Sequence, residues 1–387
     1  MLNKNIYTLL TASLFLFYSF VPAQPLQAQQ KEKYENLSEA LMLSSKLRGK
    51  QGPRNLVWID NGNRYSYMKY DSVAQSYQIR AYNPSTREDK LVFSDKDLTF
   101  PDSDEPFEYK DFQWSKDFNY LVFRTNFRPV YRNSGISDYY LYSLESKELT
   151  LLAEDARTAE LSPDGKKIGY ERDGDMFVYF IDSGVEKQLT NSGKKYFYNG
   201  RFGWVYEEEF GLVQAWEWSP DSKYIAYWQT DERNVHLYLL PDYSPHHVKY
   251  DSIPYPQAGD ENPTVRIGTL NVKNGDSQWM NVKLDEGYIP RIYWTAEEGQ
   301  LAVVHLNRLQ DHLKLYFCDA TTGDNRLVME EKSKYWIDIF DFFADVSDFF
   351  YFPENHDEFF WISDRNGWSH IYRYNYDGKL LNQVTRG

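Results

Sequence analysis

Three adjacent glutamates, Glu207, Glu208 and Glu209, are the residues of this chain whose type and spacing best suit chemistry. They lie between large apolar residues in the segment 204–210, which reads WVYEEEF. Because a solvated charge run would have polar neighbours, we expect these flanks to be buried and the carboxylates to lie at the edge of a packed region. Fixed, partly desolvated carboxylates are suited to binding a cation such as an amine. A solvated surface loop is the alternative interpretation of the same run.

The sequence carries no recognisable catalytic machinery. It contains no Gly-x-Ser-x-Gly nucleophile elbow, no His-Glu-x-x-His helix, no Cys/His metal cluster and no glycine-rich phosphate loop. We therefore expect no catalytic residue, no metal and no cofactor in this chain. The single cysteine, Cys318, excludes an intrachain disulfide and, since it lies in an apolar run, is expected to be a buried thiol on a strand.

The composition favours a globular, all-β protein. Hydrophobic residues make up 42% of the chain and charged residues 26%, which argues against disorder. Aromatic residues make up 18%, and aromatic side chains pack well on pleated sheets. The formal net charge of −14 argues against a nucleic-acid partner, because phosphate binding needs a basic surface.

A repeated turn organises the chain. An aromatic residue or leucine precedes a turn of the Ser-Pro-Asp-Gly kind, and a short apolar strand follows it, in the segments 114–117 (WSKD), 161–165 (LSPDG) and 218–222 (WSPDS). Weaker copies begin at Trp294 and Phe352. Proline presets φ, aspartate bonds the local backbone and glycine accepts a positive φ, so each copy predicts a tight turn between strands.

The spacing of these turns predicts the blades of a β-propeller. The first two intervals are 47 and 57 residues long, and several short strands fit within each. The interval from Trp218 to Trp294 is longer, at 76 residues, and rich in proline, so we expect an inserted loop there. About five blade-like units are visible. We expect the chain to stop within the propeller, since an open arc would leave sheet edges exposed.

The N-terminus has the pattern of a signal peptide. Lys4 supplies a positive charge, residues 7–21 form an uncharged and mostly apolar stretch, and Ala23 and Ala28 are candidate cleavage positions. We therefore expect a periplasmic or secreted protein with a signal peptide over residues 1–28. An uncleaved membrane anchor is the alternative.

The segment 203–211, GWVYEEEFG, resembles the double-glutamate motif of the dipeptidyl peptidase IV family of serine peptidases, within the prolyl oligopeptidase group. The segment 131–134, YRNS, stands where that family carries its substrate-binding arginine. Further similarities, in the order of the family, are 254–259 (PYPQAG), 262–265 (NPTV), 287–291 (GYIPR), 306–310 (LNRLQ) and 364–372 (DRNGWSHIY). The resemblance runs from about residue 35 to residue 387.

The resemblance implies an eight-bladed propeller that caps an α/β-hydrolase domain with a Ser, Asp and His triad. That hydrolase domain is not in this chain, and about five of the eight blades are. The implied organisation is a signal peptide over 1–28, an N-terminal segment over 29–50 and a truncated propeller domain over 51–387.

The resemblance also assigns roles to the candidate site. Glu208 and Glu209 would hold the free N-terminal amine of a peptide substrate, and Arg132 would orient these carboxylates and hold a substrate carbonyl. Glu207 would face elsewhere and support the segment. The implied activity is removal of N-terminal dipeptides, Xaa-Pro preferred, with catalysis in the missing hydrolase domain. The resemblance leaves a homodimer open.

Two positions depart from the family pattern. Gly203 stands where many members have aspartate, and Asn133 replaces the usual histidine after the arginine. Both could alter how the site is held. The triple-glutamate form favours a dipeptidyl over a tripeptidyl product.

Two other classes of function remain open at the level of sequence. One is a non-catalytic, extracytoplasmic propeller that uses the acidic run to dock a basic partner. A reading frame that continues into a Gly-x-Ser-x-Gly segment would discriminate against it. The other is a propeller hydrolase with its own carboxylate pair, which would need two acids across a pocket.

Overall fold

The computed structural model describes residues 34–43, 52–101, 103–283, 287–339 and 348–387. The chain divides into two units, Met1–Pro53 and Arg54–Gly387. The first of these units contains helix α1 (Leu37–Leu43). The expected signal peptide over 1–28 lies outside the described residues and stays a prediction. Within the described ranges, no helix is both long and apolar enough to cross a membrane.

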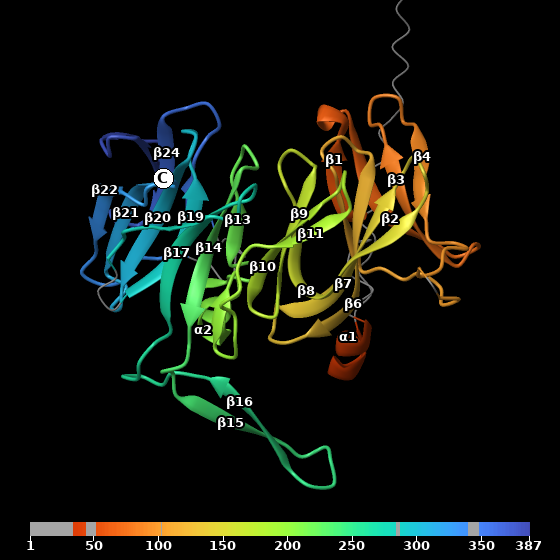
Figure 1. Ribbon diagram of the computed structural model, residues 1–387, viewed down its shortest axis with the longest axis horizontal. Helices are drawn as coiled ribbons and strands as arrows, with labels where there is room; N and C mark the ends of the chain where they lie inside the picture. The colour runs from red at the N-terminus through yellow and green to blue at the C-terminus, as the bar shows by residue number, and fades with distance from the viewer. Residues whose placement is uncertain (1–33, 44–51, 102, 284–286, 340–347) are drawn as a thin grey trace, which may run out of the picture. The chain divides into compact units, whose positions relative to one another are not determined.

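The unit Arg54–Gly387 consists of antiparallel sheets that follow one another in chain order (Figure 1). The first sheet contains β1 (Arg54–Ile59), β2 (Arg64–Asp71), β3 (Ser76–Tyr82) and β4 (Asp89–Ser94), with the short helix η2 (Asp60–Gly62) between β1 and β2. The second contains β5 (Asp111–Trp114), β6 (Tyr120–Pro129), β7 (Gly135–Ser143), β8 (Leu149–Leu161), β9 (Lys167–Arg172), β10 (Asp175–Phe180) and β11 (Val185–Gln188).

The remaining sheets complete the described part of this unit. The third contains β12 (Phe197–Asn199), β13 (Trp216–Trp218), β14 (Tyr224–Asp231), β17 (Thr264–Asn271) and β18 (Ser277–Trp279), with helix α2 (Trp204–Phe210) between β12 and β13. The last two contain β19 (Gly287–Trp294), β20 (Gln300–Asn307), β21 (His312–Asp319) and β22 (Asn325–Lys332), and β23 (Phe350–Tyr351), β24 (Glu358–Ser363), β25 (His370–Asn375) and β26 (Leu380–Gln383).

The seven-stranded sheet is two propeller units that share the long strand β8. The first part of β8 pairs with β7 as far as Ala156, and the second part of β8 pairs with β9 from Arg157. Between them the strand bends, because Asp155 and Thr158 have φ values of 52° and 47°. Each half therefore belongs to a different four-stranded unit.

The predicted all-β, partial-propeller architecture is confirmed, but the described residues hold six units and not about five. The unit that the sequence did not reveal is β1–β4, which precedes the first copy of the repeated turn. Its first two strands are joined by η2, whose residue Asn61 has a φ of 51°, and not by a Ser-Pro-Asp turn. A search for that turn therefore could not find this unit.

The repeated turns have one shared hydrogen-bond pattern. Ser162 Oγ lies 2.6 Å from Asp164 Oδ1 and accepts the backbone N–H of Lys167 at 3.0 Å. The turns that begin at Ser115 and Ser219 repeat both contacts. The fourth position has a positive φ in all three, although only Gly165 is a glycine. The serine and aspartate side chains therefore hold a backbone conformation that glycine favours but does not have to supply.

Tryptophan side chains connect neighbouring units. Trp218 Nε1 donates to the carbonyl of Glu160, and Trp294 Nε1 donates to the carbonyl of Glu217, each at 3.3 Å. Trp114 Nε1 donates to Ser66 Oγ at 2.8 Å. Each donor stands at the end of a strand that leads into a turn, so the aromatic residue of the sequence repeat joins its unit to the preceding one.

The expected insertion between Trp218 and Trp294 is present, but it is a β-hairpin. Its strands are β15 (Leu237–Asp242) and β16 (Lys249–Pro254), which pair with each other in a separate two-stranded sheet. The hairpin follows β14, and its six antiparallel residue pairs make the segment regular where an open loop was expected. Cys318 is buried in β21 as expected, and burial raises the pKa of its thiol to about 12.

The connections between strands lie at two opposite ends of the sheets. Since neighbouring strands are antiparallel, the Ser-x-Asp turns lie at one end of the sheets, and the β6–β7, β9–β10 and β14–β17 connections lie at the other. Helix α2 precedes β13 and lies at this second end, as does the β15–β16 hairpin (Figure 1). The topology thus brings the segments 130–134 and 203–211 to the same end.

Replacing Ser162 with alanine tests the role of the turn. The Ser162→Ala variant loses both hydrogen bonds of its hydroxyl, so we expect the free energy of unfolding to fall by about 1–2 kcal/mol. The measurement is the urea midpoint, with the exposed Ser183→Ala as the matched control. Equal midpoints for the two variants would show that the hydroxyl does not hold the turn.

Candidate functional site

Helix α2 carries the three glutamates and is defined by a glycine at each end. Gly203 precedes it in an extended conformation, and Gly211 ends it with a φ of 67°. The N–H of Gly211 donates to the carbonyl of Glu207 at 3.1 Å, which completes the last turn. A helix of seven residues is marginal alone, so its stability comes from packing.

Two aromatic residues anchor α2 to strand β19. Tyr206 is fully buried, stacks on Phe202 at 5.1 Å between ring centroids and accepts the N–H of Ile289 at 3.2 Å. The carbonyl of Phe210 accepts Arg291 Nη2 at 2.8 Å. The apolar flanks of the acidic run are therefore buried as expected, and they fix the helix that presents the glutamates.

Glu207 faces the β6–β7 connection. Its side chain is 2% exposed, and its Oε1 accepts the backbone N–H groups of Asn133 at 2.7 Å and Ser134 at 3.0 Å. Hydrogen bonds from backbone N–H to a carboxylate are stronger than those between neutral groups. This carboxylate therefore joins two propeller units and fixes the residue next to Asn133, which is Arg132.

Arg132 and Glu208 form an ion pair at the surface of the same end. Arg132 Nε lies 3.3 Å from Glu208 Oε2, with 63% of the arginine side chain and 14% of the glutamate side chain exposed. An exposed ion pair contributes about 0–1 kcal/mol to stability. The pair is thus better suited to orienting a carboxylate than to holding the fold.

Glu209 is the exposed member of the three. Among the described residues it forms neither a hydrogen bond nor an ion pair, so both of its oxygens are free to accept from a ligand. One carboxylate oriented by an arginine, next to a free carboxylate on a fixed helix, is an arrangement that can hold a cation with hydrogen-bond donors.

The departure at Gly203 has a structural counterpart that the sequence did not indicate. A Cβ atom at this position would lie 1.6 Å from Glu232 Oε1, so the Glu232 carboxylate occupies the space of any side chain there. Glu232 is 2% exposed. Burial raises its pKa to about 7, against the opposing charge of Arg201. In the sequence Glu232 lies in a charged run after β14 and looks like a solvated residue.

Several of the motifs that resemble the family gather around α2. Trp204 packs on Tyr255 with ring centroids 4.4 Å apart, and Phe210 packs on Tyr288 at 5.2 Å. Asn262 Nδ2 donates to Tyr288 Oη at 2.7 Å. The loop after the hairpin and the start of β19 thus support the same helix.

The motif over 364–372 contributes to the contact between the last two sheets and not to the surroundings of α2. Glu331 of β22 accepts Trp361 Nε1 and Ser363 Oγ, each at 2.6 Å, and pairs with Arg365. These contacts join the last two sheets. Within the ranges that the structure describes, no group of three or more His, Cys, Asp or Glu side chains could hold a metal ion.

The family comparison covers most of the chain. The family described as the dipeptidyl peptidase IV N-terminal region matches residues 115–387. Among curated relatives, dipeptidyl peptidase 4 of Trichophyton tonsurans is 28% identical over 353 residues, which cover 86% of this chain and 43% of that protein. Dipeptidyl peptidase 4 of Bos taurus is 27% identical over 307 residues, covering 72% of this chain and 39% of that protein. The chain thus spans less than half of the length of these relatives.

Two solved structures are similar to this chain over most of its length. The crystal structure of Porphyromonas gingivalis dipeptidyl peptidase 4 is similar with a TM-score of 0.80 and 26% identity, covering 92% of this chain and 50% of that one. A putative dipeptidyl aminopeptidase IV from Bacteroides ovatus is similar in fold, with a TM-score of 0.65 and 19% identity, covering 87% and 47% of the two chains.

Alanine substitution of Glu207 and of Glu209 tests which of the two carboxylates stabilises the fold. The Glu207→Ala variant leaves two backbone N–H groups without their acceptor, so we expect the free energy of unfolding to fall by about 2–4 kcal/mol. The exposed Glu209→Ala is the matched control and should change it by less than about 0.5 kcal/mol. Urea denaturation measures both. A Glu207→Ala midpoint equal to that of Glu209→Ala would contradict the structural role of Glu207.

Proposed function

The chain belongs to the dipeptidyl peptidase IV family as the N-terminal region of its members, and on that premise we propose that it binds the free N-terminus of peptides for a serine exopeptidase. The proposed enzyme removes N-terminal dipeptides, with Xaa-Pro preferred. The observation that carries the proposal is the free Glu209 carboxylate beside the Arg132–Glu208 pair on a buried, fixed helix.

The chemistry of a peptide N-terminus fits this pair of carboxylates. An α-amino group has a pKa of about 8, so it is largely cationic at neutral pH. Two charge-assisted hydrogen bonds, to Glu208 and Glu209, would each contribute on the order of 1.5–3 kcal/mol. Since internal peptide bonds carry no such charge, the pair would set the distance from the N-terminus to the cleaved bond.

Arg132 has two proposed tasks. It orients the Glu208 carboxylate, with which it pairs, and its exposed guanidinium is free to hold a carbonyl of the substrate. Glu207 acts through Arg132, because it fixes the neighbouring backbone at Asn133 and Ser134. It is a positioning residue in this proposal and does not contact the substrate.

The nucleophile, its base and the oxyanion hole belong to a separate hydrolase domain in this proposal. The pocket that prefers proline would come from that domain too. We further propose secretion or periplasmic location through the signal peptide over 1–28, followed by an N-terminal segment over 29–50 and the propeller domain over 51–387. No nucleic acid, metal or cofactor takes part in the proposed function.

A non-catalytic interaction module is the competing function. In that case the exposed carboxylates of α2 would dock a basic partner, and no peptidase activity would accompany the full-length protein. The two functions are separated by the requirement for a free N-terminus, which only the exopeptidase has.

Kinetics of the full-length protein test the amine-binding role. We expect Glu209→Gln to lower kcat/KM for a Gly-Pro-type chromogenic substrate by tenfold or more, mainly through KM, because one charge-assisted hydrogen bond is lost. Glu145→Gln, which removes an exposed carboxylate in the β7–β8 connection, is the matched control and should have no effect. An Nα-acetylated substrate should not be cleaved. Unchanged kinetics of Glu209→Gln would rule out the proposed role.

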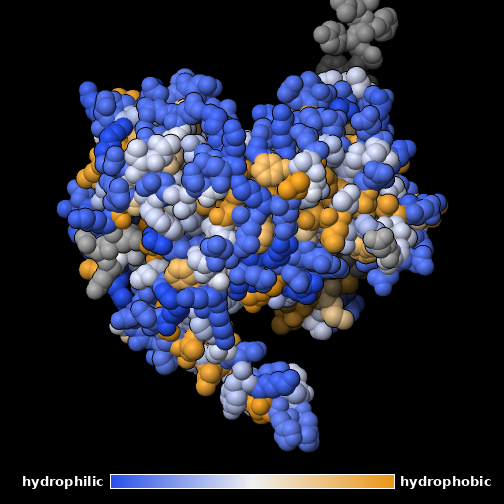
Figure 2. Space-filling model, in the orientation of Figure 1, coloured by the Kyte–Doolittle hydropathy of each residue, from blue (hydrophilic) through white to orange (hydrophobic). Residues whose placement is uncertain are grey.

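We also propose that the protein forms a homodimer through the β15–β16 hairpin. Leu237, Leu239 and Tyr250 share one face of the hairpin by register and are 41%, 58% and 64% exposed. Figure 2 shows apolar surface at the base of the hairpin and along part of it. An isolated two-stranded hairpin is only marginally stable in water, and a second copy would cover this face.

Light scattering after size exclusion tests the dimer. The parent protein should have twice the mass of one chain, and Leu239→Asp should have the mass of one chain, since a charge in the apolar contact is costly. Leu240→Asp, on the opposite face, should stay dimeric. A parent protein with the mass of one chain would contradict the dimer.

A further inference from the structure

A set of polar residues lies on the strands that lead into the repeated turns, outside the α2 site. The residue before the aromatic residue or leucine of each repeated turn lies at or next to the end of a strand in five consecutive units, and these residues are Gln113, Glu160, Glu217, Tyr293 and Tyr351. Hydrogen bonds place their strands side by side: Gln113 Nε2 reaches the carbonyl of Ala159, and Trp294 Nε1 reaches the carbonyl of Glu217. Polar side chains therefore line these strands on one side.

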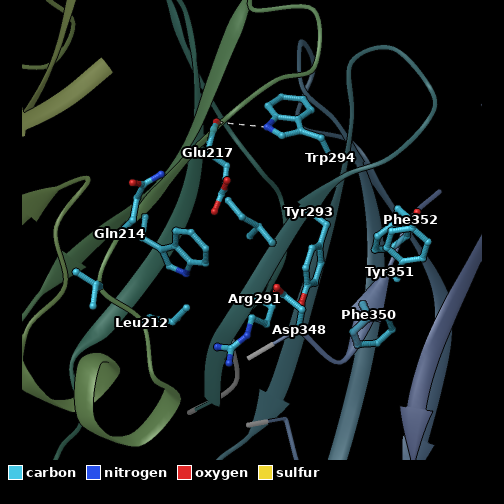
Figure 3. Close-up of a pocket in the computed structure, with 13 residues that line it drawn as sticks. Leu212, Gln214, Glu217, Arg291, Tyr293, Trp294, Asp348, Phe350, Tyr351 and Phe352 are labelled. Carbon is cyan, nitrogen blue, oxygen red and sulfur yellow. Dashed lines mark hydrogen bonds between the residues drawn. The ribbon is translucent and has the colours of Figure 1, made fainter. Parts of the chain in front are cut away.

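A cavity of about 580 Å³ lies between β13, β19 and β23 with its flanking residues. Aromatic rings form much of its wall, among them those of Trp228, Tyr293, Trp294 and Tyr351. Figure 3 shows the Glu217 side chain pointing into this space, with Tyr293 across from it and Asp348 and Arg291 near its lower end. Aromatic walls with a few convergent polar groups are common in small-molecule sites.

The Glu217 carboxylate has no hydrogen-bond partner among the described residues. Trp294 Nε1 donates to the backbone carbonyl of Glu217 and not to its carboxylate. Burial raises the pKa of Glu217 to about 8, and the Glu160 and Asp348 carboxylates add to the effect. Glu217 is half-buried, and a partly desolvated carboxylate without a donor would be stabilised by a ligand that supplies a positive charge.

The nearby arginine does not supply that charge to Glu217. Arg291 donates to the carbonyls of Pro290, Phe210 and Ile339, which commits its guanidinium to the end of α2. Its charge acts on Asp348 and Tyr293. Glu160 accepts Gln214 Nε2 at 2.7 Å, a neutral donor. The Glu160 and Asp348 carboxylates thus act on Glu217, whereas the charge of Arg291 acts on Asp348.

From this geometry we propose that the cavity binds an organic ammonium group, with Glu217 as its counter-ion and the aromatic rings as its walls. Aromatic faces attract cations, whereas divalent metal ions need more oxygen ligands than this cavity offers. The ammonium group belongs either to a free amine or to a lysine side chain of a peptide. The site is separate from Glu208 and Glu209 and does not rest on the proposed peptidase function.

Calorimetric titration of the full-length protein tests the site. The two probes are Nα-acetyl-lysine amide, which has no free N-terminus, and benzylamine. We expect saturable binding of at least one, and the tighter of the two identifies a peptide side chain or a free amine as the source. The neutral benzyl alcohol should not bind, because it offers no charge to Glu217.

Variants assign the binding to this cavity. Glu217→Gln should weaken binding tenfold or more, and Asp348→Asn should weaken it to a smaller extent. Glu354→Gln, which removes an exposed carboxylate near β23, is the matched control and should bind as the parent does. The double variant Glu208→Gln with Glu209→Gln should keep the binding that Glu217→Gln weakens, and Nα-acetyl-lysine amide, which has no free N-terminus, should bind it as it binds the parent. The folded state of each variant is checked by its thermal midpoint.

The dependence on pH gives a second readout. Lysine side chains stay protonated well above pH 8, so affinity should rise between pH 6 and about 9 as the Glu217 carboxyl, whose pKa is about 8, ionises. The rise should be lost in Glu217→Gln, although Glu160, Asp348, Arg291 and Tyr293 remain. Absence of saturable binding would overturn the proposal. It would equally be overturned if binding survived Glu217→Gln and disappeared in the Glu208, Glu209 double variant.

Discussion

The candidate site depends on one interaction, the acceptance of two backbone N–H groups by the buried Glu207 carboxylate. This contact crosses from α2 to the β6–β7 connection, and it fixes Arg132 because its neighbour Asn133 is held. Without it, the arginine would lie on a surface connection with no fixed relation to the helix. The rest of the site follows, since Arg132 orients Glu208 and Glu209 stays free.

Three chemically identical side chains therefore have three roles, and burial decides which residue has which role. Glu207 is inside and accepts fixed donors, Glu208 is partly covered and pairs with an arginine, and Glu209 is exposed. The same principle applies on the inner strands. Glu160 has a neutral donor, whereas the Glu217 carboxylate has none among the described residues and can therefore accept the charge of a ligand. In both places, the propeller supplies carboxylates at fixed positions and leaves part of their hydrogen bonding unsatisfied.

Local patterns in the sequence predicted the parts of the fold that have local causes. The Ser-x-Asp turns and their tryptophans indicated the propeller, because each turn is held by side chains within a few residues. The unit β1–β4 escaped notice because its first turn uses η2. Glu232 could not be assigned, since its place against Gly203 depends on two segments 29 residues apart that meet only after folding. The cavity beside Glu217 likewise needs strands from three units, and no spacing in the sequence indicates it.

The most direct test of the central claim is a structure of the full-length protein with an uncleaved Xaa-Pro peptide bound. Our account predicts that the peptide's N-terminal nitrogen lies within about 2.7–3.2 Å of carboxylate oxygens of both Glu208 and Glu209. It also predicts that Glu207 keeps its two contacts to the backbone at Asn133 and Ser134. A peptide whose N-terminus lies away from α2, with both carboxylates facing solvent, would contradict it.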